Sequence, residues 1–237
     1  MTDKILAVAG ESLSQKCRER LAQLGFEVVI LPSYERLGRG VDTHADMMLF
    51  ALDNRIFTYK GLGERLRELG REYEIAEIAY EPSEKYPDDI ALNCLKVGKY
   101  IFCKRKHTAK EVLEYAEKGG YIVVNINQGY ARCSACPVGD MGLISADPSM
   151  LAGASVVGID RLPINAGSVS LDGFDYGFIG GACGYCDGSL YFSGDLRAHP
   201  DGDRIESFCK GLGVDAVSLS DEPLKDVGSI FFFKIKP

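Results

Sequence analysis

The sequence has no tryptophan, and its 237 residues include only three histidines and nine prolines. It also lacks a run of about 18 uncharged apolar residues, the length that a helix needs to cross a bilayer. The first ten residues are too short and too acidic at their start for a secretion signal. These absences exclude a membrane-spanning helix, and we expect a cytoplasmic protein with no membrane partner.

Positive charge is in deficit, with 34 acidic against 27 basic residues and a net charge of −7. Proteins that bind a nucleic-acid backbone neutralise phosphates with basic side chains, so no nucleic-acid partner is expected. Hydrophobic residues make up 46% and charged residues 26%, which is typical of a chain that folds around its own core. No Pro-rich or Ser/Gly-rich linker interrupts it, and we predict one domain over residues 1–237.

Eight cysteines without an export signal are expected to be reduced, as core residues, metal ligands or nucleophiles. Four of them lie in apolar helix-like or strand-like segments and are predicted to be buried fillers: Cys17, Cys94, Cys103 and Cys209. The others form two C-x-x-C pairs, Cys133/Cys136 and Cys183/Cys186. The 46 residues between Cys136 and Cys183 exceed the roughly 15–20 of compact zinc modules, so no metal is predicted. Zinc held by all four thiols is the alternative, and a redox pair is another.

A repeat runs through the chain. Five helical patterns are each followed by a short apolar strand, and most are preceded by two strands joined by a turn. The unit is strand, strand, helix, strand, and its copies begin near Asp46, Asp89, Cys133, Asp175 and Asp226. The last copy holds only its first strand, within Asp226–Ile235, so residues 5–31 must supply the rest. The prediction is a closed ring, which removes exposed strand edges. The alternative, an open α/β sheet, would have one strand for each helix.

Local signals refine the repeat. Thr108 and Asp147 are predicted to cap helices, and Gly70 to end one. A strand is predicted at Ser155–Ile159, after a helix over Pro148–Ala152.

Several motifs carry a family resemblance. They are HADMMLF (44–50), NQGYARCSAC (127–136), GFIGGACG (177–184), LYFSGDL (190–196) and DVGSIFFF (226–233). With the fivefold repeat, they make the chain similar to the pentein fold, the α/β propeller shared by arginine deiminases, dimethylarginine hydrolases and amidinotransferases. Most closely, the chain resembles bacterial proteins of unassigned activity in this guanidino-group-modifying enzyme (GME) fold. The resemblance covers essentially the whole chain, and ribosome anti-association factors share its architecture without that chemistry.

The resemblance implies a thiolate that attacks a guanidinium carbon, a histidine that transfers protons and carboxylates that hold the nitrogens. His44 and Asp46 match its H-x-D pattern, and on an extended segment both side chains would point to one face. The alternative is a pair that fixes the start of a strand. The resemblance also implies a cysteine in the segment Asp226–Phe233, but Ser229 is the only nucleophile-like residue there.

Other thiols are therefore candidates. Cys183 follows two glycines that allow a ligand to approach, and we predict it as the catalytic thiol beside His44 and Asp46. Cys133 follows Arg132, whose charge is expected to depress the pKa of that thiol.

Acids recur at the heads of the units, and they predict an acidic pocket on the ring axis. The predicted ligand-binding residues are Asp89, Arg132, Asp175 and Asp226. Hydrogen bonds at strand starts are the alternative role for these acids. His107 and His199 are expected to face solvent.

The sequence thus predicts a protein that binds or modifies a small cationic ligand with a guanidino or amino group. If it is an enzyme, it is a Cys-dependent hydrolase or transferase of the guanidino-modifying type, although the missing C-terminal cysteine favours binding without reaction. The alternative is a non-catalytic scaffold or metal-binding module.

Overall fold

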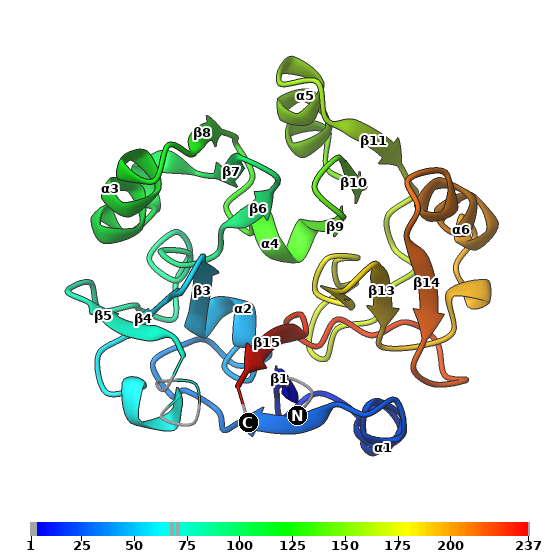
Figure 1. The fold of residues 1–237 in the computed structure, drawn as a ribbon, viewed down its shortest axis with the longest axis horizontal. Coiled ribbons are helices and arrows are strands. Elements are labelled where there is room, and N and C mark those ends of the chain that lie inside the picture. The colour runs from blue at the N-terminus through cyan, green and yellow to red at the C-terminus, as the bar shows by residue number, and fades with distance from the viewer. Residues whose placement is uncertain (1–3, 67–68, 70–71, 237) are drawn as a thin grey trace.

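The computed structural model of the protein describes residues 4–66, 69 and 72–236. These residues form five three-stranded sheets arranged around a ring (Figure 1). In each sheet the middle strand pairs antiparallel with the first strand of the unit and parallel with the last. The longer helices lie on the outside, whereas the first strands and two one-turn helices, over residues 45–48 and 131–134, lie near the centre. The predicted strand, strand, helix, strand unit is confirmed.

Four units follow each other along the chain. The first comprises β3 (Leu49–Leu52), β4 (Arg55–Tyr59), the 3₁₀ helix η1 (Gly63–Leu66) and β5 (Glu74–Ile78). The second comprises β6 (Leu95–Val97), β7 (Tyr100–Cys103), the 3₁₀ helix η2 (Arg105–His107), α3 (Lys110–Lys118) and β8 (Ile122–Asn125). The third comprises β9 (Ala135–Val138), β10 (Gly142–Ser145), α5 (Pro148–Val156) and β11 (Asp160–Pro163). The fourth comprises β12 (Cys183–Cys186), β13 (Ser189–Phe192), the 3₁₀ helix η3 (Leu196–Ala198), α6 (Gly202–Gly211) and β14 (Asp215–Ser218).

The fifth unit is built from both ends of the chain. It comprises β15 (Phe231–Ile235), β1 (Lys4–Gly10), α1 (Gln15–Gln23) and β2 (Glu27–Leu31). Strand β15 pairs antiparallel with β1, with Phe233 opposite Leu6, and β1 pairs parallel with β2. Strands β1 and β15 accordingly lie side by side in Figure 1. Ring closure by the terminal strands is confirmed.

A hydrogen-bonded belt joins the five units near the ring centre, in the turns that precede the first strands. It runs from Asp46 N to Gly228 O (3.0 Å), from Ser229 N to Gly181 O (2.8 Å), from Gly181 N to Cys133 O (2.9 Å), from Arg132 N to Asn93 Oδ1 (2.7 Å) and from Asn93 Nδ2 to Asp46 O (3.1 Å). Each unit thus bonds to its neighbour, and the last bond returns to the first unit. The second unit takes part through the Asn93 side chain, and the other four through backbone groups.

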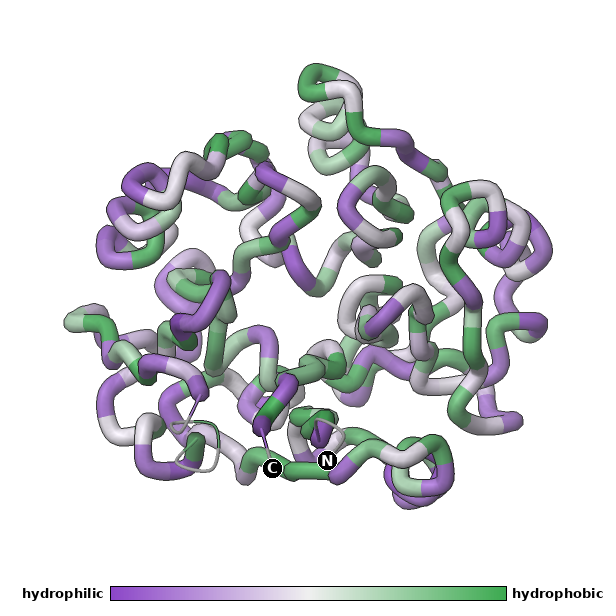
Figure 2. The backbone as a smooth tube through the Cα atoms, viewed as in Figure 1, coloured by the Kyte–Doolittle hydropathy of each residue, from purple (hydrophilic) through white to green (hydrophobic). Residues whose placement is uncertain are grey.

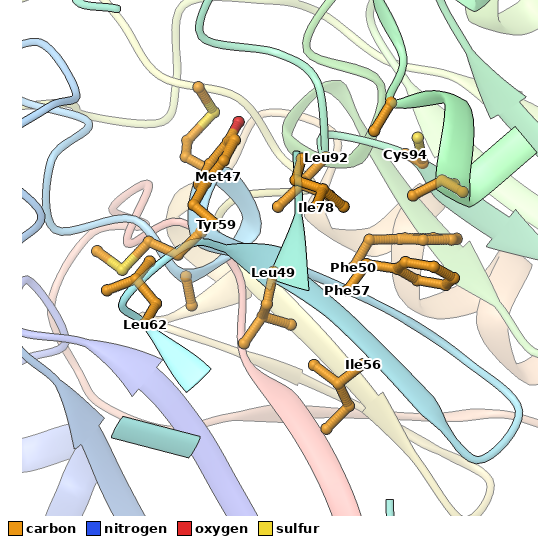
Figure 3. Packing of buried hydrophobic residues seen from close by; sticks show 14 of the residues in the cluster. Met47, Leu49, Phe50, Ile56, Phe57, Tyr59, Leu62, Ile78, Leu92 and Cys94 are labelled. Atoms are coloured by element: carbon orange, nitrogen blue, oxygen red, sulfur yellow. The ribbon is translucent and has the colours of Figure 1, made fainter. Parts of the chain in front are cut away.

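Apolar residues pack between the sheets and the outer helices. Phe50 of β3 and Phe57 of β4 are cross-strand partners and lie side by side in the largest cluster (Figure 3). Leu92 and Cys94, from the turn before β6, extend the same cluster toward the second unit. Hydrophobic residues are concentrated in strands such as β1 and β2, whereas hydrophilic residues alternate along the outer helices (Figure 2). No helix in residues 4–66, 69 and 72–236 is long and apolar enough to cross a membrane.

Some local predictions were wrong. Helix α5 continues to Val156, and its strand is Asp160–Pro163 rather than Ser155–Ile159. The Val156-Val157 pair has a strand-like sequence, but the Asp147 cap holds the helix, which ends before Gly158 at φ 73°. The Asp147 cap is confirmed, whereas Thr108 donates its hydroxyl to Lys104 O instead of capping α3. Gly70 lies outside the described residues.

Candidate functional site

The turn that carries His44 and Asp46 is helical rather than extended. A one-turn helix, α2 (Ala45–Met48), precedes β3, and His44 stands at its N-cap. The helix forms because the Met47 amide bonds back to His44 O, while the Asp46 amide joins the belt. The expectation of an extended segment with both side chains on one face was therefore wrong. Both side chains are buried, each 1% exposed.

Asp46 lies buried in the centre of the ring. Its Oδ2 accepts hydrogen bonds from Ser229 Oγ at 2.6 Å and from Cys133 Sγ at 3.2 Å. Asn93 Nδ2 lies 3.0 Å from Cys133 Sγ and donates to it. These four side chains come from the turns of the first, second, third and fifth units, so the ring does bring the unit heads together.

A cavity of about 410 Å³ opens above this cluster, and we call it the axial pocket. His44 and Cys133 line it, together with three of the predicted acids. The full lining is Gly38, Arg39, Val41, His44, Glu84, Asp89, Tyr130, Cys133, Leu171, Phe174, Asp175, Tyr176, Phe178 and Asp226. Asp46 is not part of this lining and contacts the pocket through Cys133.

The lining of the axial pocket contains one guanidinium group, that of Arg39, and four carboxylates: Glu84, Asp89, Asp175 and Asp226. Asp226 is almost completely buried, and burial raises its pKa to about 6, although nearby His44 acts in the opposite direction. Burial also raises the pKa of Asp89, while the hydrogen bond from Tyr130 to its Oδ2 (2.7 Å) opposes this. The pocket is acidic at neutral pH because a carboxyl group with a pKa near 6 is mostly ionised at pH 7.

Several buried polar atoms at this site have no hydrogen-bond partner within the described residues. They are Nδ1 and Nε2 of His44, Oδ1 of Asp46 and Oδ1 of Asp89. His44 Nδ1 is 3.7 Å from Asp226 Oδ1, which is too long for a hydrogen bond. Three of these atoms belong to His44 and Asp89, which line the axial pocket. Buried polar groups are rarely left unpaired, so these three indicate a ligand or water that pairs with them.

Aromatic rings form one wall of the axial pocket. Tyr130 packs against Tyr86 and Phe178, with ring centroids 5.6 and 6.4 Å apart. Phe178 also meets Tyr176 in an edge-to-face contact. Phe174 and Tyr176 are about half exposed, as expected for residues at the mouth of a pocket. The axial pocket therefore offers a planar cation both aromatic faces and carboxylates.

Cys133 is the cysteine whose side chain lines the axial pocket. Its thiol donates to Asp46 and accepts from Asn93. Burial, with the negative charges of Asp46 and Asp226, raises the pKa of this thiol well above its ordinary value. The expected depression by Arg132 is therefore absent, and Cys133 is a neutral thiol in the free protein at pH 7.

Cys183 and Arg132 lie elsewhere. Cys183 is fully buried on β12, with its Sγ 2.7 Å from Cys136 Sγ. Arg132 donates to Gly180 O at 2.8 Å and to Cys183 O at 3.1 Å, and its charge acts to lower the pKa of Cys183. Neither residue lines the axial pocket. Arg132 instead ties the third unit to the fourth.

The paired cysteines do not converge as a set of four. The thiols of Cys136 and Cys183 are in contact, whereas the Cys133 thiol donates a hydrogen bond to Asp46. Cys186 lies at the end of β12, and burial raises the pKa of its thiol to about 11. Within residues 4–66, 69 and 72–236, no three or more His, Cys, Asp or Glu side chains are grouped to hold a metal ion.

Ser229 stands in the segment where the resemblance implies a cysteine. It is fully buried, has a φ of 67°, and its hydroxyl lies 2.6 Å from Asp46 Oδ2 and 3.1 Å from Gly180 O. With both contacts inside the protein, its visible role is to hold the turn before β15 against the first and fourth units.

Sequence reasoning missed Asn93, Glu84 and Arg39. The position of Asn93 in the repeat could have identified it. Asn93 lies two residues before the first strand of its unit, β6. Cys133 and Ser229 occupy the same position before β9 and β15. Glu84 and Arg39 come from irregular loops, where no periodic pattern marks a residue that faces the axis.

Comparisons with known proteins agree on the architecture. No curated protein matches the chain. Solved structures that resemble it include a dimethylarginine dimethylaminohydrolase mutant from Pseudomonas aeruginosa in complex with citrulline. That match has a TM-score of 0.58 at 10% identity and covers 99% of this chain and 100% of the other.

Two further structures with different activities also match. An amidinotransferase of the saxitoxin biosynthetic pathway from Microseira wollei has a TM-score of 0.56 at 9% identity, over 92% of this chain and 90% of the other. A C. jejuni agmatine deiminase has a TM-score of 0.51 at 8% identity, over 92% and 87%. At such identities the likeness establishes the fold, and that fold is the pentein propeller.

A family model matches residues 8–231, which is nearly the whole chain. Its description is "Family of unknown function (DUF6873)". The protein therefore belongs to this family and has the pentein fold.

Proposed function

We propose that the axial pocket binds a small ligand through a guanidinium or amino cation. The observation that carries the proposal is the group of unpaired buried atoms at an acidic cavity, above all Oδ1 of Asp89. A carboxylate oxygen can only accept hydrogen bonds, so its missing partner is a donor. A cationic donor also offsets part of the negative charge of the four carboxylates that line the pocket.

A guanidinium group fits the pocket better than a simple ammonium does. Its planar fork donates several N–H bonds in fixed directions, which suits a pocket lined by more than one carboxylate, among them Asp89 and Asp226. Its flat face can stack on Tyr130 or Phe178. Among the matched structures, the dimethylarginine dimethylaminohydrolase mutant is in complex with citrulline, and another protein is an agmatine deiminase.

Covalent modification of the ligand is a second candidate function, favoured by the position of Cys133. In this scheme the bound cation lowers the pKa of the thiol, and the thiolate attacks the guanidinium carbon. The carbon–nitrogen bond to the amine then breaks, and the amine leaves with the proton that the thiol gave up. His44 can carry this proton, because both its ring nitrogens lack partners among the described residues. The remaining carbon stays bonded to Cys133 Sγ until water displaces it. What supports Cys133 over Cys183 is that Cys133 lines the pocket, whereas Cys183 is sealed against Cys136.

Isothermal titration calorimetry tests the binding proposal, with agmatine, arginine and guanidinium as ligands and inorganic phosphate as the negative control. Asp89→Asn should weaken the best cationic ligand tenfold or more, since one buried contact with a charged partner contributes about 1.5–3 kcal/mol. Asp140→Asn, on an exposed turn, is the matched control and should bind normally.

Three results would contradict the proposal. They are no heat with any cation, equal binding of phosphate, and an unchanged affinity in Asp89→Asn. Incubation of the wild type with agmatine, followed by mass spectrometry, then separates binding alone from covalent modification at Cys133.

A further inference from the structure

A second cavity of about 280 Å³ lies between the third and fourth units. It is formed by the start of α5, the loop that follows β11, and the turn between η3 and α6. Tyr176 and Phe178 line both this cavity and the axial pocket, so they separate the two. We call the second cavity the inter-unit pocket.

His199 lines the inter-unit pocket and is not solvent-facing as the sequence indicated. It is 4% exposed. The Asp201 amide donates to its Nδ1 at 3.0 Å, which requires that Nδ1 carry no proton. Burial lowers the pKa of His199, so the ring is neutral at pH 7 and its proton is on Nε2. This Nε2 is buried and has no partner in the described part of the chain.

The Asp201 amide occupies Nδ1 of His199, so the Nε2–H group is the one that a ligand in the pocket can reach. An N–H in this position needs an acceptor, and leaving it unpaired costs more than a typical hydrogen bond contributes. The missing partner in the inter-unit pocket is therefore an acceptor, whereas the axial pocket needs a donor.

The charges around His199 select the kind of acceptor. Asp201 adjoins it, with its carboxylate bound to Asn165 and Arg204. Asp147 lines the pocket, and its carboxylate caps α5 and accepts from Gln128 at 2.9 Å. Asp201 is paired with Arg204, but an anionic ligand would meet the negative charge of Asp147 in the pocket wall. A neutral carbonyl oxygen would meet the N–H without that repulsion.

The remaining walls are largely apolar, with Ile164, Val169, Ile179 and Phe178 among them. We propose that the inter-unit pocket is a second binding site, which takes a small neutral ligand whose carboxamide or urea oxygen accepts from His199 Nε2–H. Its apolar part packs against these side chains. This site goes beyond the proposed function, because it lies outside the axial pocket and has the opposite hydrogen-bonding demand.

Benzamide and benzoate form a matched pair of probes, since they share the ring and differ in charge at the carbonyl group. Nuclear magnetic resonance of the full-length protein, labelled with ¹⁵N at histidine, follows the three imidazoles separately. Benzamide should shift the His199 Nε2 signal in a saturable way and leave His107 unchanged, and benzoate should bind at least tenfold more weakly.

His199→Asn is the informative variant. Its side-chain oxygen can still accept from the amide two residues later, as in an Asx turn, but it has no Nε2–H donor. Benzamide should bind this variant about five- to tenfold more weakly, the factor expected for one hydrogen bond. His107→Asn is the control and should bind normally. Asp89→Asn should also bind benzamide normally, which separates this site from the axial pocket.

The proposal is overturned if benzamide leaves the His199 signal unchanged, which would mean that the cavity holds only water. It is equally overturned if benzoate binds as well as benzamide, or if His199→Asn folds and binds benzamide as well as the wild type does. Should that variant fail to fold, the wild-type titration with the two probes still decides the question.

Discussion

Asp226 joins the fold to the axial pocket. Its two carboxylate oxygens accept from the amides of Phe178 (2.9 Å) and Gly228 (3.1 Å), so it fixes the loop that carries the aromatic wall and the turn before β15. Gly181 must be a glycine, because a Cβ there would lie 1.8 Å from Asp226 Oδ1. The cost is that a charge is buried, and burial raises the pKa of Asp226 to about 6.

This pKa makes the stability of the ligand-free protein depend on pH. The folded state keeps the Asp226 proton up to about pH 6, whereas the unfolded chain releases it near pH 4, so stability is lost as pH rises between these values. We expect a loss of about 3 kcal/mol in the free energy of unfolding, since each pKa unit corresponds to about 1.4 kcal/mol.

Urea unfolding at pH 4 to 7 measures this dependence, with Asp226→Asn as the reference because it has no carboxyl group to titrate. The difference in slope between the two proteins isolates Asp226 from the other acids. Parallel curves would show that its proton is not retained.

Protonation of Asp226 should also weaken cation binding below pH 6, because the protonated carboxyl group is neutral.

Cys133 should react selectively with a cationic alkylating agent. The acidic axial pocket concentrates cations, so cationic 2-bromoethylamine should be favoured over neutral iodoacetamide at Cys133. The ratio of the two alkylation rates should be at least tenfold higher at Cys133 than at Cys186. Because its pKa is raised, the rate at Cys133 should increase with pH above 8. Peptide mass spectrometry after timed quenching gives both rates.

Agmatine provides the control for this experiment. It should protect Cys133 and leave Cys186 unaffected. Equal rate ratios at the two thiols would show that the pocket charge does not act on Cys133.

At the scale of elements, the turns before the first strands determine the site. The sequence indicated where these turns fall, since the acids at the unit heads mark them, and three of those acids do line one pocket. It did not indicate that the first turn is a one-turn helix. Two hydrogen bonds decide that, one donated by the Asp46 amide to Gly228 O and one by the Met47 amide to His44 O. For the same reason it could not reveal that Arg132 and Cys183 lie away from the pocket while Cys133 lines it.

Asn93 is the side chain that completes the belt, so the second unit should depend on it. Asn93→Ala removes the bonds to Arg132 N and Asp46 O in a fully buried place, and we expect a loss of about 2–4 kcal/mol in unfolding free energy. Asn93→Asp keeps the acceptor for Arg132 N but loses the donor to Asp46 O and adds a negative charge next to Asp46. This variant should therefore be no more stable than Asn93→Ala.

Asn125→Ala is the matched control for Asn93. It removes a similar bond from a side chain to the Arg105 amide on the exposed surface, and it should cost less than about 1 kcal/mol. Similar losses for the two alanine variants in urea titrations would show that the belt has no special role.

At the scale of the whole molecule, closure puts residues that are distant in sequence onto one axis. Asp46 and Ser229 are 183 positions apart and share a hydrogen bond, and Lys4 lies opposite Ile235 in the sheet of the fifth unit. The repeat predicted this closure because the final copy of the unit was incomplete. The fold therefore needs the pairing of β15 with β1, but it should not matter at which loop of the ring the chain begins and ends.

Two chain alterations test this, and they should give opposite results. Deletion of Asp226–Pro237 removes β15, exposes the edge of β1 and takes Asp226 and Ser229 from the centre of the ring, so cooperative thermal unfolding should be lost. Deletion of Lys236 and Pro237 alone should leave the melting temperature unchanged.

A circular permutant keeps every element but moves the break in the chain. If a short Gly/Ser linker joins the present ends and the chain opens between Asp187 and Gly188, the cut falls in the hairpin between β12 and β13, where both residues have positive φ and the Asp187 side chain is 56% exposed. Such exposed hairpin tips tolerate new termini. The permutant should melt cooperatively within about 10 °C of the wild type, since one changed turn costs on the order of 1–2 kcal/mol in a domain of this size. An unfolded permutant, or a deletion variant that melts like the wild type, would mean that closure of the ring by its two ends is not what holds the fold together.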